Sequence, residues 1–234
     1  MRNCNFPLIF TFLVSLSCGS RDNNQSESFS EIKGSNESNE KIEAVPILIM
    51  TYPVESFSTW KSAFEEDKSN RESLNIVDLG DLVSFEDSRM VSVFLKTPSH
   101  KKGEEFAKSD AMQKSLKLMG VIGDANIILI DALQLPERPV PQRYRMMITH
   151  EIEEYNHWKK IFDQHEPERR DAGLELIGLG RSIINAKIIS VMSAFDDMDA
   201  AQIFAASDEL RNAMKESGVI SDPILAWYEN PRAN

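Results

Sequence analysis

Short apolar runs alternate with longer amphipathic segments from residue 45 almost to the end of the chain. Runs bounded by turn-forming residues predict strands, and the first four lie at 45–50, 74–85, 90–95 and 127–130. Between them, Phe57, Trp60 and Phe64 recur at helical spacing, as do Phe106 and Met112 in a second segment. The pattern predicts two helices, in the order strand, helix, strand, strand, helix, strand.

The ends of these helices carry recognisable signals. Ser56 or Ser58 can accept hydrogen bonds from the free amides of the first helical turn. Thr97-Pro98-Ser99 predicts the start of the second helix, and Gly120 is placed to end it in the left-handed conformation.

The whole pattern occurs twice, because Trp158 follows Trp60 by 98 positions and other residues recur at the same separation. The matched pairs include Phe64/Phe162, Arg71/Arg169, Gly80/Gly178, Ser109/Ser207 and Gly120/Gly218. In the second copy, Asn156 and Asp197 are the predicted helix caps. Its predicted strands are 144–150, 174–179, 187–192 and 224–228. The chain therefore consists of two copies of one small domain.

One copy by itself predicts a split βαβ, or ferredoxin-like, fold, in which helices cover one face of a four-stranded antiparallel sheet. The other face would expose on the order of several hundred Å² of apolar surface, more than a soluble monomer normally tolerates. At about 25 cal/mol per Å², covering it stabilises the protein by tens of kcal/mol before chain entropy is subtracted. The second copy, joined covalently, can cover this face at any protein concentration.

The second copy also carries motifs that resemble those of the dimeric α/β-barrel superfamily, which includes antibiotic-biosynthesis-monooxygenase-like domains. The motifs are Trp158-Lys159-x-x-Phe162-Asp163-x-His165-x-x-x-Arg169-x-x-x-Gly173-Leu174 and Ser207-Asp208-x-Leu210-Arg211-x-x-Met214-x-x-x-Gly218-Val219. In that superfamily two ferredoxin-like units pair sheet to sheet, usually as a homodimer. The resemblance therefore implies an α+β fold with two tandem ferredoxin-like βαββαβ repeats, packed sheet to sheet as an intramolecular pseudo-dimeric α/β barrel.

The first residues indicate export rather than folding. A positive start is followed by an apolar run at 6–16, too short to span a bilayer and typical of a secretory signal. The run ends in Ser15-Leu16-Ser17-Cys18-Gly19, which resembles a bacterial lipobox, where cleavage precedes a lipid-bearing cysteine. The alternative is a plain signal peptide cut at Ser17. Cleavage would leave Cys18 as the only cysteine, which favours acylation over a disulfide.

The segment after Cys18 is rich in Ser, Asn, Glu and Asp and buries too little apolar surface to fold, so it predicts a disordered tether. Three prolines then mark a stiff connector between the copies. The predicted divisions are a lipoprotein signal peptide (1–17), the tether (18–44), repeat 1 (45–135), a Pro-rich linker (136–143) and repeat 2 (144–231).

A net charge of −11 repels phosphate backbones and argues against a nucleic-acid partner. The expected partners are instead a membrane, through lipid on Cys18, and a small aromatic ligand. The expected location is the bacterial cell envelope. Gly19 is not the aspartate of inner-membrane retention, so the outer membrane, facing the periplasm or the cell surface, is preferred. The covalent repeat predicts a monomer.

Candidate chemistry lies in repeat 2. His150 ends its first strand, and His165 and Arg169 follow one another on the helical side; these three are the candidate catalytic residues. Histidine suits proton transfer or the polarisation of a phenolic substrate. The candidate substrate-binding residues are Trp158, Phe162 and Glu151.

Structural roles compete with each of these assignments. Both histidines can be structural, one at the edge of the core and the other at a strand end in solvent. Trp60 and Trp158 are favoured as core anchors, and Arg71 and Arg169 as members of surface ion pairs. The spacing of His150, His157 and His165 fits no metal motif, so neither a metal nor a cofactor is predicted.

Three functions follow from these observations. The first is a lipid-anchored envelope module that binds a small molecule without catalysis. The second is a cofactor-independent monooxygenase-like or isomerase-like enzyme with one site in repeat 2. The third is a structural envelope protein. The enzyme hypothesis requires His150 and His165 to face one cavity of roughly 300 Å³ or more.

Overall fold

A computed structural model describes residues 44–233 of the chain. The predicted signal peptide, Cys18 and the tether up to residue 43 lie outside the described residues. Repeat 1 contains β1 (Val45–Pro53), α1 (Phe57–Glu66), α2 (Lys68–Ser73), β2 (Val77–Ser84), β3 (Met90–Lys96), α3 (His100–Lys108), α4 (Asp110–Leu118) and β4 (Asn126–Gln134). Repeat 2 contains β5 (Tyr144–Glu151), α5 (Tyr155–Gln164), α6 (Glu166–Asp171), β6 (Glu175–Ser182), β7 (Ile188–Phe195), α7 (Met198–Ala205), α8 (Asp208–Glu216) and β8 (Ile224–Glu229).

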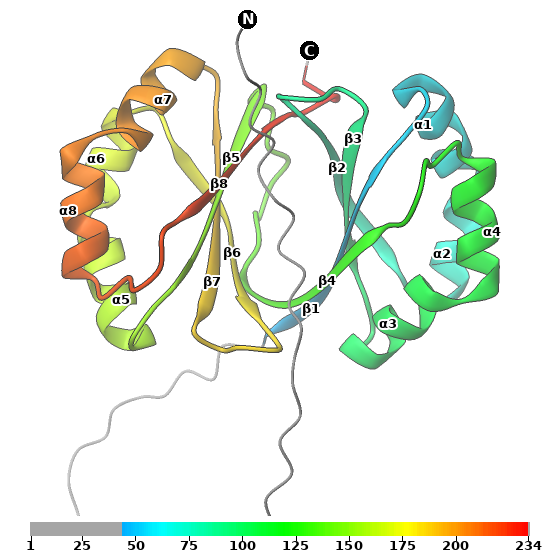
Figure 1. Cartoon of the computed structure of the whole chain (residues 1–234), viewed down its shortest axis with the longest axis horizontal. Coiled ribbons are helices and arrows are strands. Elements are labelled where there is room, and N and C mark those ends of the chain that lie inside the picture. Colours follow the sequence, from blue (N-terminus) through cyan, green and yellow to red (C-terminus); the bar gives the residue numbers. More distant parts are fainter. Residues whose placement is uncertain (1–43, 234) are drawn as a thin grey trace, which may run out of the picture. The chain divides into compact units, whose positions relative to one another are not determined.

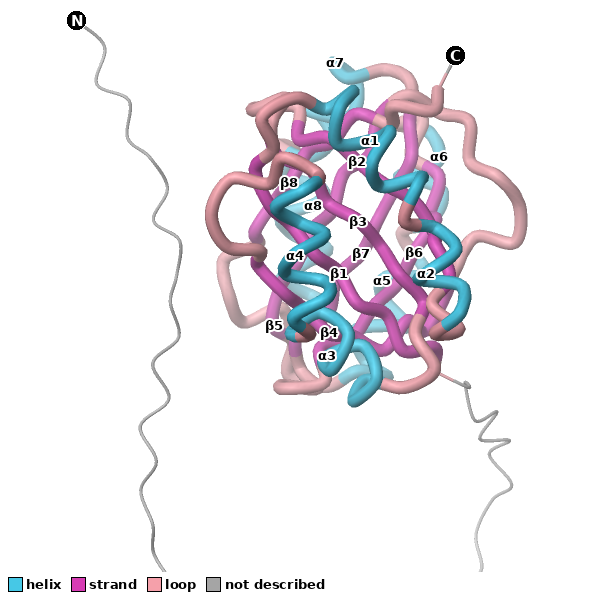
Figure 2. The backbone as a smooth tube through the Cα atoms, turned by 90° about the vertical axis from the view of Figure 1, so that its right-hand side faces the viewer, coloured by secondary structure: helices cyan, strands magenta, loops and turns pink. Residues whose placement is uncertain are grey.

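The eight strands form one closed antiparallel barrel in the order β1-β3-β2-β8-β5-β7-β6-β4. Each repeat supplies four adjacent strands, and its helices lie outside them, α1–α4 on one side of the barrel and α5–α8 on the other (Figures 1 and 2). The two sheets therefore face each other across the barrel. The prediction of two tandem ferredoxin-like repeats packed sheet to sheet as a pseudo-dimeric α/β barrel is confirmed.

The two junctions between the sheets follow the 98-residue repeat. At one junction Asp131 pairs with Arg181, and at the other Glu229 pairs with Val83. Glu229 is the counterpart of Asp131, and Val83 is the counterpart of Arg181. The first junction continues as far as Gln134 opposite Leu179. At the second, the corresponding position brings Arg232 to Asp81 as a side-chain ion pair. Equivalent residues therefore pair at both junctions, although the second junction has fewer backbone pairs.

Alternate residues of each strand point to opposite faces of the barrel wall. On the outer face, Leu48 and Met50 pack against the helices of repeat 1, and Met146 and Ile148 do so in repeat 2. On the inner face, a separate apolar cluster surrounds Ile47, Ile49 and Ala132. Each sheet therefore contributes to a helix-covered core and to the barrel lumen.

The sequence predicted one helix in each helical segment, and the structure has two in each. Ser109 ends α3 and caps α4 by accepting from the amide of Met112, and Ser207 does the same before α8. The first helix of repeat 2 is capped by Glu154, which accepts from the amides of residues 156 and 157. The prediction of Asn156 as that cap is therefore wrong.

Several other sequence signals hold. Ser56 caps α1, Ser99 caps α3 and Asp197 caps α7. Gly120 and Gly218 both have positive φ angles, 75° and 77°, at the ends of their helices. The similarity of the two repeats therefore includes this left-handed backbone conformation, which glycine adopts without steric cost.

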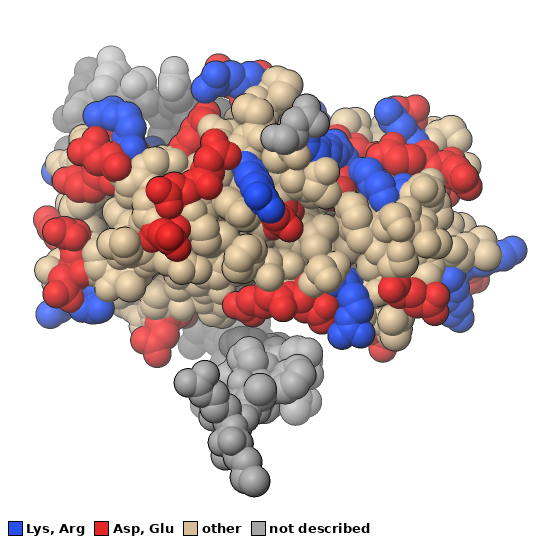
Figure 3. All heavy atoms as spheres, turned by 90° about the horizontal axis from the view of Figure 1, so that it is seen from above, with Lys and Arg blue, Asp and Glu red and all other residues tan. Residues whose placement is uncertain are grey.

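No helix within residues 44–233 is long and apolar enough to cross a membrane. On the face shown in Figure 3, lysine and arginine are interspersed with aspartate and glutamate rather than gathered into one basic patch. The absence of a nucleic-acid partner and the monomeric state stay predictions.

Candidate functional site

A cavity of about 70 Å³ lies in repeat 2 between the outer face of the sheet and the covering helices. Five of the six candidate residues line it: His150, Trp158, Phe162, His165 and Arg169. Glu151 is not among the lining residues, and its carboxylate accepts a hydrogen bond from Asn185 instead. The two histidines do face one cavity. Its volume, however, is well below the roughly 300 Å³ that the enzyme hypothesis requires.

His150 lines this cavity from β5. It is only 5% exposed, so the alternative of a strand-end histidine in solvent is wrong. Neither ring nitrogen has a hydrogen-bond partner among residues 44–233, and the ring centroid lies 5.7 Å from that of Trp158. Burial lowers the pKa of His150 to about 4. Because burial disfavours the charged form, the imidazole is neutral at pH 7 and can both donate and accept a proton in a hydrogen bond.

His165 occupies the C-cap position of α5 rather than a regular position on its face. Its Nδ1 lies 3.0 Å from the carbonyl oxygen of Ile161, which can only accept. Nδ1 therefore carries the proton, and in the neutral ring Nε2 remains an acceptor. The backbone bond fixes the ring, which is half-buried at the side of the cavity.

Arg169 is held at the cavity wall by two contacts to Phe162. Its guanidinium carbon lies 3.8 Å from the ring centroid, and Nη1 donates to the Phe162 carbonyl at 2.6 Å. Burial lowers its pKa, and the acidic residues Asp163, Glu166 and Glu168 partly oppose this shift. No carboxylate within residues 44–233 forms an ion pair with Arg169, so its predicted surface ion pair is absent.

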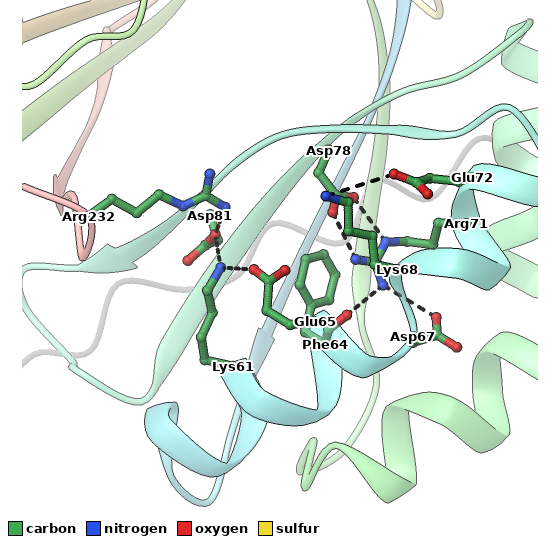
Figure 4. Close-up of polar contacts among 10 residues, drawn as sticks. All are labelled: Lys61, Phe64, Glu65, Asp67, Lys68, Arg71, Glu72, Asp78, Asp81 and Arg232. Atoms are coloured by element: carbon green, nitrogen blue, oxygen red, sulfur yellow. Dashed lines mark hydrogen bonds and ion pairs between the residues drawn. The ribbon is translucent and has the colours of Figure 1, made fainter.

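The equivalent Arg71 in repeat 1 has a different environment (Figure 4). It is 1% exposed, and its Nε and Nη2 donate to the two carboxylate oxygens of Asp78 at 2.9 and 2.8 Å. A second carboxylate, from Asp67, lies 3.3 Å from Nη1. The predicted surface pair is thus a buried one. The guanidinium carbon of Arg71 also lies 3.7 Å from the centroid of the Phe64 ring.

The contrast between the two arginines comes from two substitutions between the repeats. Leu176 stands 98 positions after Asp78, and His165 stands 98 positions after Asp67. Both acidic partners of Arg71 are therefore missing around Arg169. Leu176 was not among the candidate residues from sequence. A position-by-position comparison of acidic residues between the repeats is the signal that identifies it.

In repeat 1 the space equivalent to the cavity holds groups that pair with each other. Tyr52, the counterpart of His150, accepts a hydrogen bond from Trp60 Nε1 at 3.3 Å. Elsewhere in repeat 1, Lys61 extends from α1 to Asp81 at 2.6 Å, and Arg232 contacts the same carboxylate (Figure 4). Trp60 and Trp158 are 0% and 2% exposed, which confirms them as core anchors.

The cavity offers one guanidinium, one neutral buried imidazole and one fixed imidazole on walls that are mostly apolar but also include Glu168, Glu209, Ser193 and Ser217. Within residues 44–233 there is no group of three or more His, Cys, Asp or Glu side chains that could hold a metal ion. The arrangement therefore presents aromatic surface beside one guanidinium that can pair with an acidic group.

No protein-family model matches the chain, and no curated protein matches it. Solved structures do. A provisionally assigned monooxygenase from Fusobacterium nucleatum matches with a TM-score of 0.54 and 16% identity, over 80% of this chain and 93% of its own. A second provisionally assigned monooxygenase, from Lactobacillus acidophilus, matches with a TM-score of 0.55 and 8% identity, over 82% and 98%.

Both proteins are matched over nearly their whole length, so the likeness extends across both repeats and the linker. At these identities the likeness concerns the fold. Together with the closed eight-stranded barrel and the 98-residue repeat, it shows that this chain is a tandem duplicate with the dimeric α/β-barrel fold of monooxygenase-like proteins.

Proposed function

We propose that this chain is a lipid-anchored envelope protein that binds a small aromatic molecule with an acidic group in the cavity of repeat 2. One observation carries the proposal: Arg169 lines the cavity and has neither of the carboxylate partners that its counterpart Arg71 keeps. A half-buried guanidinium without a directly paired carboxylate favours an anionic ligand, because the ligand would supply the hydrogen-bonded pairing that Asp78 gives Arg71.

The other walls suit an aromatic body. Trp158 and Phe162 stack on each other with centroids 4.9 Å apart, and Leu174 and Met146 add apolar surface. Neutral His150 can accept from, or donate to, a hydroxyl at the far end of the ligand. The acidic group then meets Arg169 at the side of the cavity, and the ring lies between Arg169 and His150.

The cavity has to enlarge before it can hold an aromatic ring. An apolar cavity of about 150 Å³ accommodates benzene, and this one has about 70 Å³. Met146 and Met214 both line it, and methionine has three rotatable bonds and repacks at low cost. Rotation of these side chains is expected on ligand binding, so affinity should be modest.

The test uses thermal unfolding of the purified protein with benzoate, 4-hydroxybenzoate and phenol. Benzoate and 4-hydroxybenzoate are expected to raise the unfolding midpoint, and phenol to raise it less. Arg169→Met should abolish the benzoate shift. Arg170→Met is the matched control, because Arg170 is adjacent, exposed and paired with Glu166. Equal shifts in Arg169→Met and the parent protein would contradict the proposal.

A second variant restores the partner that repeat 2 lacks. Leu176→Asp places a carboxylate where Asp78 stands opposite Arg71. We expect it to weaken benzoate binding about tenfold or more, which corresponds to roughly 1.4 kcal/mol. Benzoate binding unchanged by this variant would place the anion away from Arg169.

A monooxygenase-like enzyme is the second candidate function. It is favoured by the fold shared with two provisionally assigned monooxygenases and by the uncharged His150 that lines the cavity. A neutral histidine can accept the proton of a phenolic substrate. The test is oxygen uptake with hydroquinones and phenols. Uptake that is absent from the parent protein, or unchanged in His150→Phe, would exclude this function.

We also propose that lipid on Cys18 anchors the protein in the cell envelope, with the outer membrane as the expected site. The support is the lipobox-like sequence at residues 15–19 and the lack of a second cysteine after it. In cells, Cys18→Ala should move the protein from the membrane fraction to the soluble fraction and abolish labelling by a palmitate analogue. A Cys18→Ala variant that stays in the membrane fraction and is still labelled by the palmitate analogue would contradict the anchor.

A further inference from the structure

A second and much larger cavity, of about 690 Å³, occupies the barrel lumen. It lies on the inner face of both sheets, whereas the cavity of repeat 2 lies on the outer face. The Pro-rich linker closes part of it, since residues 135, 136 and 138–141 are among the lining residues. Protein interiors rarely leave voids larger than a water molecule. Closed eight-stranded barrels are either filled by side chains or hold one small ligand.

Small residues keep this lumen open. Gly80 pairs with Phe94, which lines the lumen, so a side chain at Gly80 would point inward. A Cβ built there meets nothing within 4 Å. Gly178, its counterpart 98 positions later, pairs with Met192 on the same inner face. A Cβ at Gly178 would lie 3.4 Å from Cβ of Met192, so the open space is at Gly80.

The lumen wall contains one deeply buried cation, Arg145, which is 4% exposed. It lies two positions before Met147, another lumen residue, and therefore shares the inner face. Its counterpart in repeat 1 is Ile47. No carboxylate among residues 44–233 forms an ion pair with it. Burial lowers its pKa, while Asp196 and Glu175 partly oppose the shift from a distance.

The protein satisfies only one side of this guanidinium. Nη1 donates to the carbonyls of Gln142 and Tyr144 at 2.7 and 2.8 Å, and Nη2 donates to Val140 at 2.8 Å. Nε donates to no acceptor within the described part of the chain. The nearby carboxylate of Glu175 is already bonded by Arg138 and Gln142. Within the described residues, the hydrogen bonds of the Arg145 guanidinium thus go to neutral carbonyls only.

These observations point to an anionic ligand with an apolar body. Ile47, Ile49, Phe94 and Met192 offer an apolar wall along the lumen. A volume of about 690 Å³ falls in the range of small-molecule sites, about 300–1,000 Å³. A carboxylate matches the free Nε edge of a guanidinium and compensates its charge.

We propose that the barrel lumen is a second binding site, which takes a monocarboxylic acid with an aliphatic chain and holds its carboxylate at Nε of Arg145. This site is independent of the aromatic-acid site in repeat 2, because the wall of the barrel separates them.

The test uses the compact unit Lys41–Asn234, which contains every strand of the closed barrel and avoids detergent. Decanoate and decan-1-ol are titrated by calorimetry. Saturable binding of decanoate is expected, at least tenfold tighter than that of decan-1-ol. Arg145→Met should remove the preference for decanoate while decan-1-ol still binds. The variant also loses the hydrogen bonds from Arg145 to the linker carbonyls of Val140 and Gln142. Circular dichroism and thermal unfolding therefore check that it remains folded.

A second variant tests the lumen without touching Arg145. Gly80→Leu fills the inner face and should weaken both probes at least tenfold. Gln202→Leu adds the same side chain on the exposed surface of α7 and should change neither affinity. Decanoate that fails to bind the parent unit, or that binds Gly80→Leu as tightly as the parent, overturns the proposal. The proposal is also overturned if a folded Arg145→Met variant prefers decanoate over decan-1-ol as strongly as the parent unit does.

Arg169→Met separates this site from the aromatic-acid site. It should abolish the benzoate response and leave decanoate binding unchanged. If decanoate binding is lost in Arg169→Met and retained in Gly80→Leu, the aliphatic acid binds in repeat 2 and the lumen site is overturned.

Discussion

Arg71 and Asp78 are joined by two parallel hydrogen bonds, of 2.9 and 2.8 Å, beneath the first helices of repeat 1. The equivalent pair in repeat 2 is Arg169 and Leu176, which can form neither bond. One duplicated position thus carries a closed ion pair in one repeat and an arginine with no carboxylate partner in the other. This difference makes the two halves of a symmetric barrel chemically unequal.

The arginines should therefore differ in their effect on stability. Arg71→Met leaves the carboxylates of Asp78 and Asp67 without their cation. Breaking a buried pair in this way costs about 3 kcal/mol or more. Arg169→Met leaves no carboxylate behind and should cost about 1 kcal/mol, mainly from the lost stacking on Phe162. Urea unfolding of the two variants measures both values, and equal losses would contradict the assigned difference.

Stability should fall in acid because of His150. Its pKa is about 4 in the folded protein and about 6.5 when unfolded, so the unfolded state binds the proton first. The contribution is fully present above about pH 6.5 and is lost as the pH falls toward 4. At most roughly 3 kcal/mol is involved. His150→Phe provides the comparison: the difference in unfolding free energy between it and the parent should change across this window and be constant above it.

Gly218 and Gly80 should respond in opposite directions to replacement by alanine. Gly218 has a φ of 77°, and alanine there would cost about 1–2 kcal/mol through backbone strain. Gly80 has no such angle and has open space around a new Cβ. Gly80→Ala should stabilise the fold by about 0.4–1 kcal/mol by restricting the unfolded chain. Thermal unfolding distinguishes the two, and destabilisation by Gly80→Ala would show that its conformation is restricted after all.

Replacing Asp81 by leucine should cost little. Repeat 2 already has Leu179 at this position, packed in an apolar cluster. The Asp81 side chain is fully buried, and its Oδ2 has no partner within residues 44–233. Lys61 would keep Glu65, and Arg232 is half exposed to water. We expect Asp81→Leu to lie within about 1 kcal/mol of the parent at pH 7. A loss of 3 kcal/mol or more would mean that the ion pairs stabilise the seam between β2 and β8.

The sequence determined the architecture because the signals for it are local and repeated. Apolar periodicity predicted the elements, and the 98-residue repeat predicted that they occur twice. Capping residues such as Ser99 and Asp197 were recognisable, since a cap depends only on the next three residues. Glu154 was missed in favour of Asn156, because both can cap and the backbone angles that decide between them are not visible in sequence.

The sites depended on contacts that sequence spacing does not reveal. The sequence brought His150, His165 and Arg169 forward as candidates, but whether they share a cavity depends on how helix and sheet pack. Glu151 follows His150 directly and yet points to the opposite face of the strand, away from the cavity. The burial of Arg71 and the solitary charge of Arg145 required the tertiary structure, because each is fixed by which carboxylates other elements bring, or do not bring, within reach of a guanidinium.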